Sequence, residues 1–292
     1  MEHRYHLEQM RHTCVAFGEF DGLHRGHLAI LAALVAEAGR SGRTAAMVSC
    51  YAPLKSQQAG SLTTEEEKAY LLKETGLSVL VSFNIEENIM AKETFIQEII
   101  IDQMGAEVIV TGANNQELEL LKMIAAAAGV QVLIVDTKKQ AGEELTSGLV
   151  RRALLASDME KVASLCDGPY RMLGEVIHGK ALGRTVGMPT ANLCVSDFKL
   201  KPPSGVYAVT AKVRGASYRG LTNIGLRPSV DDLPVLTIET YLIEFSGEIY
   251  GEQMVIEVYA FLREIQKFQN LEEVRAQVQK DLDFANTFLI KP

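Results

Sequence analysis

Residues 13–27 of this 292-residue chain read TCVAFGEFDGLHRGH, and this stretch decides the fold of the first half. The apolar segment TCVAF (13–17) predicts a buried strand, and the glycine-rich turn after it leads into a helix. Gly39 follows the helical pattern and predicts its end. The helix is indicated by apolar residues that recur three or four positions apart: Ile30, Leu31, Leu34, Val35 and Ala38.

The alternation of strand and helix continues to about residue 136. Thr64 and Glu67 have the spacing of a capping box and predict the start of a helix. Because helices separate the strands, the sequence predicts a mainly parallel sheet covered on both faces, with ligands bound at the carboxyl ends of its strands. Strands are predicted at 44–49, 77–83, 106–112 and 130–136, and helices at 93–105 and 116–129.

The second half has a different pattern, in which β-branched and aromatic segments alternate with glycine and proline. Two short helical stretches (149–165) precede it, and we place the domain boundary between residues 167 and 168, giving domains 1–167 and 168–292. The strand pattern predicts a small antiparallel barrel or sandwich. A C-terminal helix is expected to cover it with one apolar face, formed by Leu271, Val274, Val278 and Leu282.

Composition and charge limit the class of protein. The net charge of −8 argues against duplex nucleic acid or an anionic membrane as the main partner. No segment approaches the roughly 20 apolar residues of a membrane span, and the start of the chain lacks the apolar run of a signal peptide. The four cysteines form no CxxC pair, which is typical of reduced thiols in a cytoplasmic protein. Oligomeric state is not predicted.

His24 and His27 are the first candidates for chemistry, because they lie three residues apart where a turn enters a helix. Backbone N–H groups at a helix N-terminus form an anion site, and nearby glycines let a phosphate approach. Neutral imidazoles there would donate hydrogen bonds to phosphate oxygens as charge develops. A metal site is the weaker interpretation, since no acidic or cysteine partner has a suitable spacing. The remaining alternative is structural, with His24 capping the turn and His27 in solvent.

GEFDGLHRGH (18–27) resembles the GxFDGxHxGH motif of the nucleotidyltransferase module in bacterial bifunctional riboflavin kinase/FMN adenylyltransferases, also called FAD synthetases. The resemblance implies that His24 and His27 are catalytic and hold the ATP phosphates, and that Asn114 lies near the flavin. The family's TFxPHP and FRFG segments are replaced here by VSCYAPLKS and NQELEL. LTSGLVR (145–151) resembles the family's ISSTxxR motif with glycine at position 148. The ATP- and phosphate-binding residues implied for this half are Gly18, Asp21, Gly22, Gly26, Thr146, Ser147 and Arg151.

The second half resembles the riboflavin kinase module of the same family through GKALGRTVGMPTAN (179–192), NIGLRPS, TIETYLIEF, GEIYG and FLREIQKF. The resemblance implies that Glu239 is the catalytic base and that Thr190 and Asn192 are Mg²⁺ ligands. Neutral oxygen ligands suit a hard cation that already carries nucleotide phosphates. Without the resemblance, Glu239 would be read as an outward strand residue, and the PTAN stretch as a turn. ATP contacts are implied for Gly179, Gly183 and Arg184, and a flavin contact for Arg227.

The whole chain is therefore predicted to be an α/β Rossmann-like nucleotidyltransferase domain followed by a small antiparallel β-barrel riboflavin kinase domain. The expected reactions are ATP-dependent phosphorylation of riboflavin to FMN in the C-terminal half and adenylylation of FMN to FAD in the N-terminal half. Flavins and ATP are the expected small-molecule partners, with Mg²⁺ as cofactor. Two alternatives stay open, namely a single-activity member (more readily kinase-only than adenylyltransferase-only) and a flavin-binding regulatory protein with little catalysis.

Overall fold

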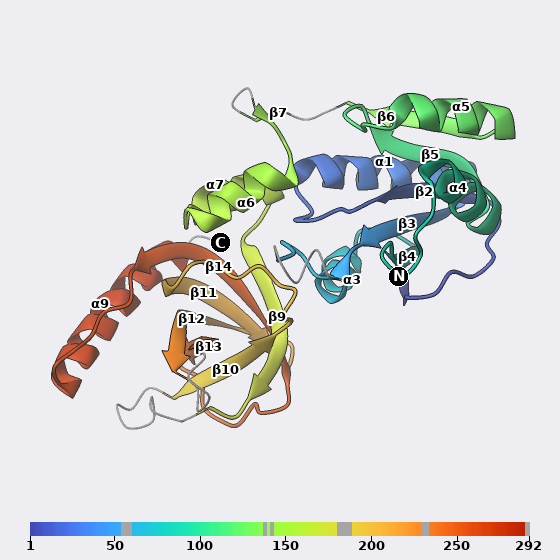
Figure 1. Cartoon of the computed structure of the whole chain (residues 1–292). Helices are drawn as coiled ribbons and strands as arrows, with labels where there is room; N and C mark the ends of the chain where they lie inside the picture. Colours follow the sequence, from blue (N-terminus) through green and yellow to red (C-terminus); the bar gives the residue numbers. More distant parts are fainter. Residues whose placement is uncertain (54–59, 137–138, 141–142, 180–188, 229–233, 290–292) are drawn as a thin grey trace. The chain divides into compact units, whose positions relative to one another are not determined.

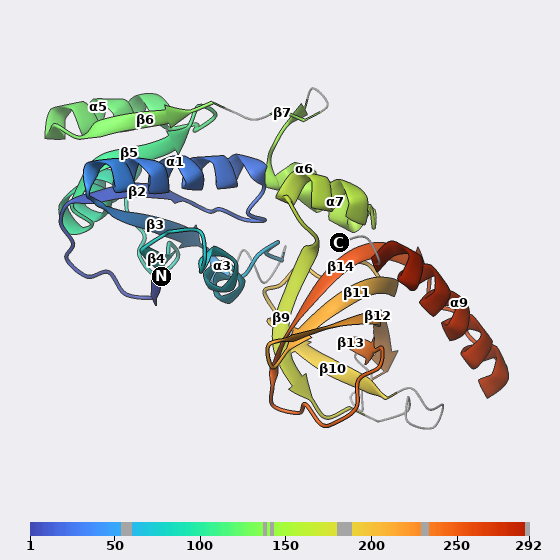
Figure 2. The same ribbon diagram turned by 180° about the vertical axis from the view of Figure 1, so that it is seen from behind.

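The computed structural model describes residues 1–53, 60–136, 139–140, 143–179, 189–228 and 234–289 (Figures 1 and 2). The chain divides into two compact units, Met1–Ser147 and Gly148–Pro292. The boundary drawn from the sequence at 167–168 instead groups the two helices of residues 147–166 with the first half.

The first unit contains a six-stranded parallel sheet in the order β1-β4-β3-β2-β5-β6. This confirms the predicted parallel sheet and the four predicted strands that follow the first. Its strands are β1 (Glu2–Arg4), β2 (Thr13–Gly18), β3 (Thr44–Tyr51), β4 (Val79–Asn84), β5 (Ala106–Gly112) and β6 (Gln131–Val135). Its helices are α1 (Arg25–Ser41), α3 (Glu65–Leu72), α4 (Lys92–Thr94), the π-helical η1 (Phe95–Gln103) and α5 (Leu118–Ala128).

Alternate residues of the central strand β2 enter two different cores, which is why its sequence is apolar throughout. Cys14 and Ala16 pack with residues of α1 and α3, including Leu34 and Leu72. Val15 enters the opposite core, with residues of η1 and α5. Burial on both faces is the expected environment of a parallel sheet with crossover helices. The two views show α1 and η1 on opposite sides of the sheet.

Three details of the first unit differ from the sequence prediction. Helix α1 does not end at Gly39 but continues to Ser41, and the left-handed residue that closes it is Gly42, with φ 68°. A left-handed φ is the property that selects glycine at a helix end. Strand β1 was missed because three polar residues carry no strand pattern, yet it pairs with β4. The helix predicted at 93–105 winds mostly in π-helical turns, as the bond from Met104 N–H to the Ile99 carbonyl shows.

The second unit is a closed six-stranded barrel in the order β10-β13-β12-β11-β14-β9, so the barrel alternative is confirmed over the sandwich. All of its described pairings are antiparallel. The strands are β9 (Tyr170–Ile177), β10 (Thr190–Val195), β11 (Gly205–Val213), β12 (Ala216–Pro228), β13 (Pro234–Leu242) and β14 (Gln253–Arg263).

The helices described for this part of the chain are α6 (Ser147–Leu155), α7 (Met159–Cys166) and the C-terminal α9 (Leu271–Leu289). Helix α9 packs Val278, Leu282 and Ala285 against Leu221 and other barrel residues, which confirms the predicted covering helix. The side chain of Leu271 lies outside the described part of the chain. A two-stranded hairpin, β7 (Lys139–Gln140) with β8 (Glu143–Glu144), follows the first sheet.

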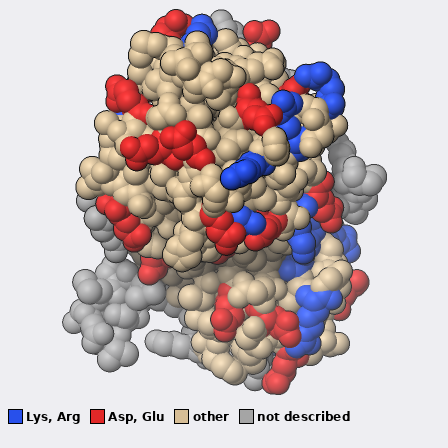
Figure 3. All heavy atoms as spheres, turned by 90° about the vertical axis from the view of Figure 1, so that its right-hand side faces the viewer, with Lys and Arg blue, Asp and Glu red and all other residues tan. Residues whose placement is uncertain are grey.

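In Figure 3, Asp and Glu side chains lie on both sides of the face shown, whereas the Lys and Arg side chains gather toward its right. All four cysteines are free thiols, as predicted. None of the helices described here is long and apolar enough to span a bilayer.

Candidate active sites

The turn between β2 and α1 has an unusual backbone that brings the two histidines together. Two large side chains adopt left-handed backbone angles within five residues, with φ 48° at Phe20 and 41° at Leu23, and Gly22 lies between them at 83°. Such angles are uncommon outside glycine and cluster at functional sites. Phe20 and Leu23 are both buried, so their packing fixes the strained turn.

His24 is the N-cap residue of α1, and its ring Nδ1 accepts a hydrogen bond from the backbone N–H of His27 at 3.3 Å. A neutral imidazole has one donor and one acceptor nitrogen, so this bond places the ring proton on Nε2. The structural role considered for His24 is thus confirmed, because its ring caps the helix. The same ring also presents an Nε2–H donor.

His27 stacks on His24, with ring centroids 3.7 Å apart and an interplanar angle of 20°. Gly26 makes this stacking possible, because a Cβ at that position would lie 3.0 Å from the His24 ring. His27 is not a solvated residue: its Nδ1 is buried and has no hydrogen-bond partner within the described ranges. A buried polar atom of this kind costs free energy unless a ligand or water satisfies it.

Both imidazoles are neutral at physiological pH. Burial lowers the pKa of His24 to about 4, with a small opposing contribution from its own backbone. Burial also lowers the pKa of His27, and His24 and Lys68 lower it further. The pair can therefore donate hydrogen bonds to an anion without carrying charge themselves.

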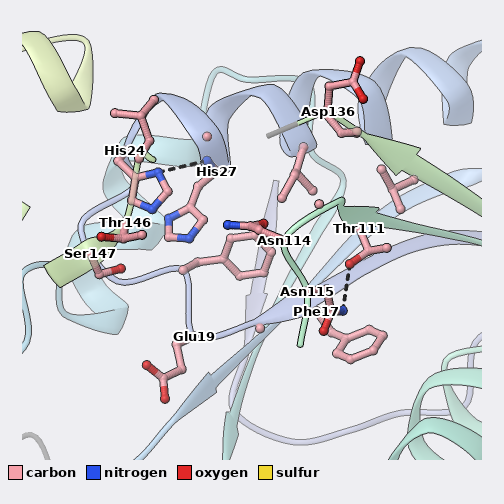
Figure 4. Close-up of a pocket in the computed structure, with 18 residues that line it drawn as sticks. Phe17, Glu19, His24, His27, Thr111, Asn114, Asn115, Asp136, Thr146 and Ser147 are labelled. Atoms are coloured by element: carbon pink, nitrogen blue, oxygen red, sulfur yellow. Dashed lines mark hydrogen bonds between the residues drawn. The ribbon is translucent and has the colours of Figure 1, made fainter. Parts of the chain in front are cut away.

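The histidines lie at one end of a cavity of about 370 Å³ at the carboxyl ends of β2, β5 and β6 (Figure 4). Asn114 extends into this space beside His27, and Gly112 permits its position, since a Cβ there would lie 2.8 Å from Asn114 Oδ1. Asn115 donates to Thr111 Oγ1 at 2.9 Å. A cavity with apolar walls and a few convergent polar groups is typical of a small-molecule site.

The cavity gathers residues that lie far apart in the sequence. The predicted residues that line it are Gly18, His24, Gly26, His27, Asn114, Thr146 and Ser147. Asp21 and Gly22 instead shape the turn: Asp21 Oδ1 accepts from the Thr63 N–H at 3.0 Å, and its carbonyl accepts from Ser147 Oγ at 2.8 Å. Arg151 lies on α6 in the second unit. Residues that sequence reasoning did not assign to the site are Phe17, Thr111, Asn115 and Asp136, and Phe20, which is part of the quoted motif but was given no role.

A second group of reactive side chains lies on one face of the barrel. Glu239 on β13 is in register with Asn192 on β10 and with Asn223 on β12, so the carboxyl group lies between two amides. Thr190 is in register with Tyr241 and shares the face of Asn192, two residues along the same strand. The alternate residues point into the barrel, where Thr222 and Thr240 hydrogen-bond at 2.9 Å.

Glu239 and Thr190 line a cavity of about 220 Å³ that is closed on one side by α9. Arg263 and Asp281, which sequence reasoning missed, also line it and tie β14 to α9 through an ion pair of 2.8 Å. Asp281 is buried, and Gln277 donates to it at 2.9 Å. These contacts hold the helix wall of the cavity against the barrel.

The glycine loop next to this cavity is only partly described. A Cβ at Gly179 would overlap the Asn192 amide, so glycine is required for this close approach. Gly183 and Arg184 lie outside the described residues, and Arg227 is described only in its backbone, on β12. The hydroxyl of Thr190 and the amide oxygen of Asn192, beside a carboxylate, form a donor set that fits a hard divalent cation.

The comparisons with known proteins match the two halves of the chain to two different family models. A model described as FAD synthetase matches residues 6–149, and a model described as riboflavin kinase matches residues 166–289. The bifunctional riboflavin kinase/FMN adenylyltransferase of Listeria monocytogenes is 32% identical, over 95% of this chain and 92% of the relative. The protein of the same description from Bacillus subtilis is 31% identical, over 96% and 94%.

A crystal structure described as a macrolide-efflux protein from Streptococcus pneumoniae superposes with a TM-score of 0.82, over 96% of this chain and 95% of that one. At 24% identity this likeness concerns the fold alone. The sequence relatives are closer, and they cover both units almost completely. The chain therefore belongs to the family of bifunctional riboflavin kinase/FMN adenylyltransferases.

Proposed function

We propose that this chain converts riboflavin to FMN in its second unit and FMN to FAD in its first unit, with ATP as co-substrate of both reactions. The observation that carries the proposal is that each unit has its own cavity, and that each cavity contains the reactive groups that its reaction needs. The matches of both halves favour this interpretation over the single-activity and regulatory alternatives.

In the second unit, Glu239 accepts the proton of the ribityl 5′-hydroxyl as that oxygen attacks the γ-phosphorus of ATP, and ADP leaves. Asn192 and Asn223 flank Glu239 through the strand register. Thr190 and Asn192 would hold Mg²⁺, which supplies charge neutralisation at the ATP phosphates when bound. Gly179 lets the chain before β10 approach Asn192 closely.

In the first unit, a phosphate oxygen of FMN attacks the α-phosphorus of ATP, and pyrophosphate leaves. His24 Nε2–H and the ring of His27 donate to the phosphate oxygens, together with the N-terminal amides of α1. The stacked rings are held by the helix cap and by Gly26, so they need little reorganisation as charge develops. Asn114, which extends into the cavity beside His27, would contact the flavin.

The direct test incubates purified protein with riboflavin, ATP and Mg²⁺ and separates the flavins by chromatography over time. FMN should appear first and FAD later, and FMN supplied alone with ATP should also give FAD. Accumulation of FMN without FAD would make this a kinase-only member, and binding without turnover would favour a regulatory protein.

Glu239→Gln tests the assignment of the base. Loss of a general base typically costs at least about 10²-fold, so FMN formation should fall by this factor while riboflavin binding is kept. The rate is measured by chromatography and binding by quenching of flavin fluorescence. FAD formation from FMN serves as control in the same preparation, because His24 and His27 are unchanged. Near-wild-type FMN formation would remove Glu239 from the mechanism.

A cytoplasmic location is a further part of the proposal. It is supported by the four free thiols, which are typical of a reducing compartment.

A further inference from the structure

A buried ion pair lies beneath the histidine turn, in a place that no motif indicated. Lys68 and Glu65, one helical turn apart on α3, form a contact of 2.7 Å between Nζ and Oε1. Their exposed fractions are 2% and 7%. Charged groups are almost never buried to this extent unless they are paired, and removing one partner leaves an uncompensated charge.

The pair rests on a row of small residues across three neighbouring strands. Gly18 on β2, Ser49 on β3 and Ser82 on β4 are partners in the sheet register. Both serines bond to the Glu65 carboxylate, Ser49 Oγ to Oε1 at 3.1 Å and Ser82 Oγ to Oε2 at 2.6 Å. Serines of two neighbouring strands thus hold the Glu65 carboxylate in place.

Lys68 reaches beyond this row to the backbone of the histidine turn. Its Nζ donates to the Glu19 carbonyl at 2.7 Å, to Ser49 Oγ at 2.9 Å and to Glu65 Oε1 at 2.7 Å. An ammonium group has three protons, and these three acceptors take all of them. Lys68 is therefore not a phosphate ligand, although it lies below a phosphate cavity.

We propose that Lys68 is a positioning residue for adenylyl transfer, which holds the strained histidine turn in place through the Glu19 carbonyl. The proposal rests on the proposed function of the first unit. Glu19 directly precedes Phe20, where the backbone enters the left-handed region, and Figure 4 shows it between the end of β2 and the two histidines. A hydrogen bond from a buried, charged donor is strong and geometrically restrictive.

The charge of Lys68 also acts on the site. Burial and His24 lower the pKa of His27, and the positive charge of Lys68 lowers it further. The ion pair thus fixes the path of the turn and favours the neutral state of the ring. The Glu65 carboxylate allows Lys68 to be buried, because it compensates the charge of the ammonium group inside the protein.

The test uses a double variant, Lys68→Met with Glu65→Gln, which removes both charges and leaves neither partner unpaired. Thr64→Ala is the matched control. It removes the N-cap bond to Glu67 N–H and weakens the same helix, but it leaves the Lys68–Glu19 contact intact. Three quantities are measured on the full chain: kcat and KM for FAD formation, the rate of FMN formation, and amide hydrogen exchange in residues 18–27.

For the double variant we expect kcat for FAD formation to fall at least tenfold with KM for FMN within twofold, because displacing the turn misplaces the donors rather than the flavin site. Exchange in residues 18–27 should be faster than in the wild type, and FMN formation unchanged. Thr64→Ala should leave kcat and the exchange of this segment as in the wild type.

A folded double variant with wild-type kcat and wild-type exchange in residues 18–27 would overturn the proposal. If the wild type makes no FAD, the adenylyl-transfer proposal fails instead, and the exchange measurement still decides whether Lys68 holds the turn. Should the double variant not fold, Lys68→Gln keeps an amide donor that is too short to reach both Glu65 and Glu19. Unchanged exchange in that variant would equally contradict the proposal.

Discussion

At the scale of single residues, the first unit keeps two histidine side chains uncharged, although histidine ordinarily titrates near neutral pH. His24 is buried, His27 has a buried Nδ1, and the two stacked rings are neutral. A cationic pair would bind ATP more tightly in the ground state, but neutral donors act most where charge accumulates during transfer. Because these rings are kept neutral by burial, we expect the stability of the unit to depend on pH and FAD formation to depend on both residues.

Replacing His27 by alanine should abolish FAD formation while FMN formation from riboflavin continues. Loss of one preorganised donor at a developing oxyanion costs on the order of 10²–10³ in rate. The measurement is the initial rate of each product by chromatography. His6→Ala is the matched control, since His6 is exposed and outside the cavity. Normal FAD formation in the His27 variant would show that the rings do not contact the phosphates.

The stability of the first unit should decrease as the pH falls from about 6.5 toward about 4. The pKa of His24 is about 4 in the folded protein, below its ordinary value of 6.5, so the unfolded chain binds its proton first. The unfolded state then carries more protons in this interval, and the free energy of unfolding rises with pH there. Urea unfolding at pH 7.5 and 5.5 measures the effect.

His24→Asn isolates the contribution of this residue. Asparagine is a good N-cap and does not titrate, so the variant should keep the cap and lose less stability on acidification. An identical pH dependence in variant and wild type would assign the loss to other groups.

At the scale of elements, the sequence predicted what local periodicity and end signals encode. The alternation of strands and helices, the capping box of α3 and the glycine at the end of α5 were all visible, because each depends on a few neighbouring residues. Strand β1 and the partners of Glu239 were not, because register between strands is decided by packing over long separations. For the same reason the motifs located the histidines but not Lys68.

Two glycines near the end of α1 differ in backbone conformation. Gly39 lies inside the helix, where a Cβ would meet nothing within 4 Å, whereas Gly42 is left-handed with φ 68°. Gly39→Ala should therefore raise the free energy of unfolding by about 0.5–1 kcal/mol, and Gly42→Ala should lower it by about 1 kcal/mol. Denaturant unfolding of both variants measures this. The opposite order would restore Gly39 as the end of the helix.

At the scale of the whole molecule, two chemistries with different leaving groups occupy two units that each contain a complete cavity. One cavity lies at the carboxyl ends of parallel strands and the other between a barrel wall and a helix. FMN is the product of one and the substrate of the other. Family models recognise each half independently, which fits two units that each supply their own reactive groups.

A mixture of two inactive variants should make FAD from riboflavin. Glu239→Gln supplies an intact first unit and His27→Ala an intact second unit, so FMN released by one protein becomes substrate for the other. Alone, each variant should give little or no FAD from riboflavin. Product formation by the mixture is measured over time at several protein concentrations. Absence of FAD from the mixture would mean that FMN passes between sites without release.

The barrel can close only when its first strand meets its last. Strand β9 begins at Tyr170 and closes the barrel by pairing with β14, which ends at Arg263. Every described strand of the parallel sheet, by contrast, precedes residue 136. Domains fold as units from the N-terminus during synthesis. On the ribosome, the strands of the parallel sheet can therefore pair before any barrel strand has been made, whereas the barrel can close only after residue 263 has been added.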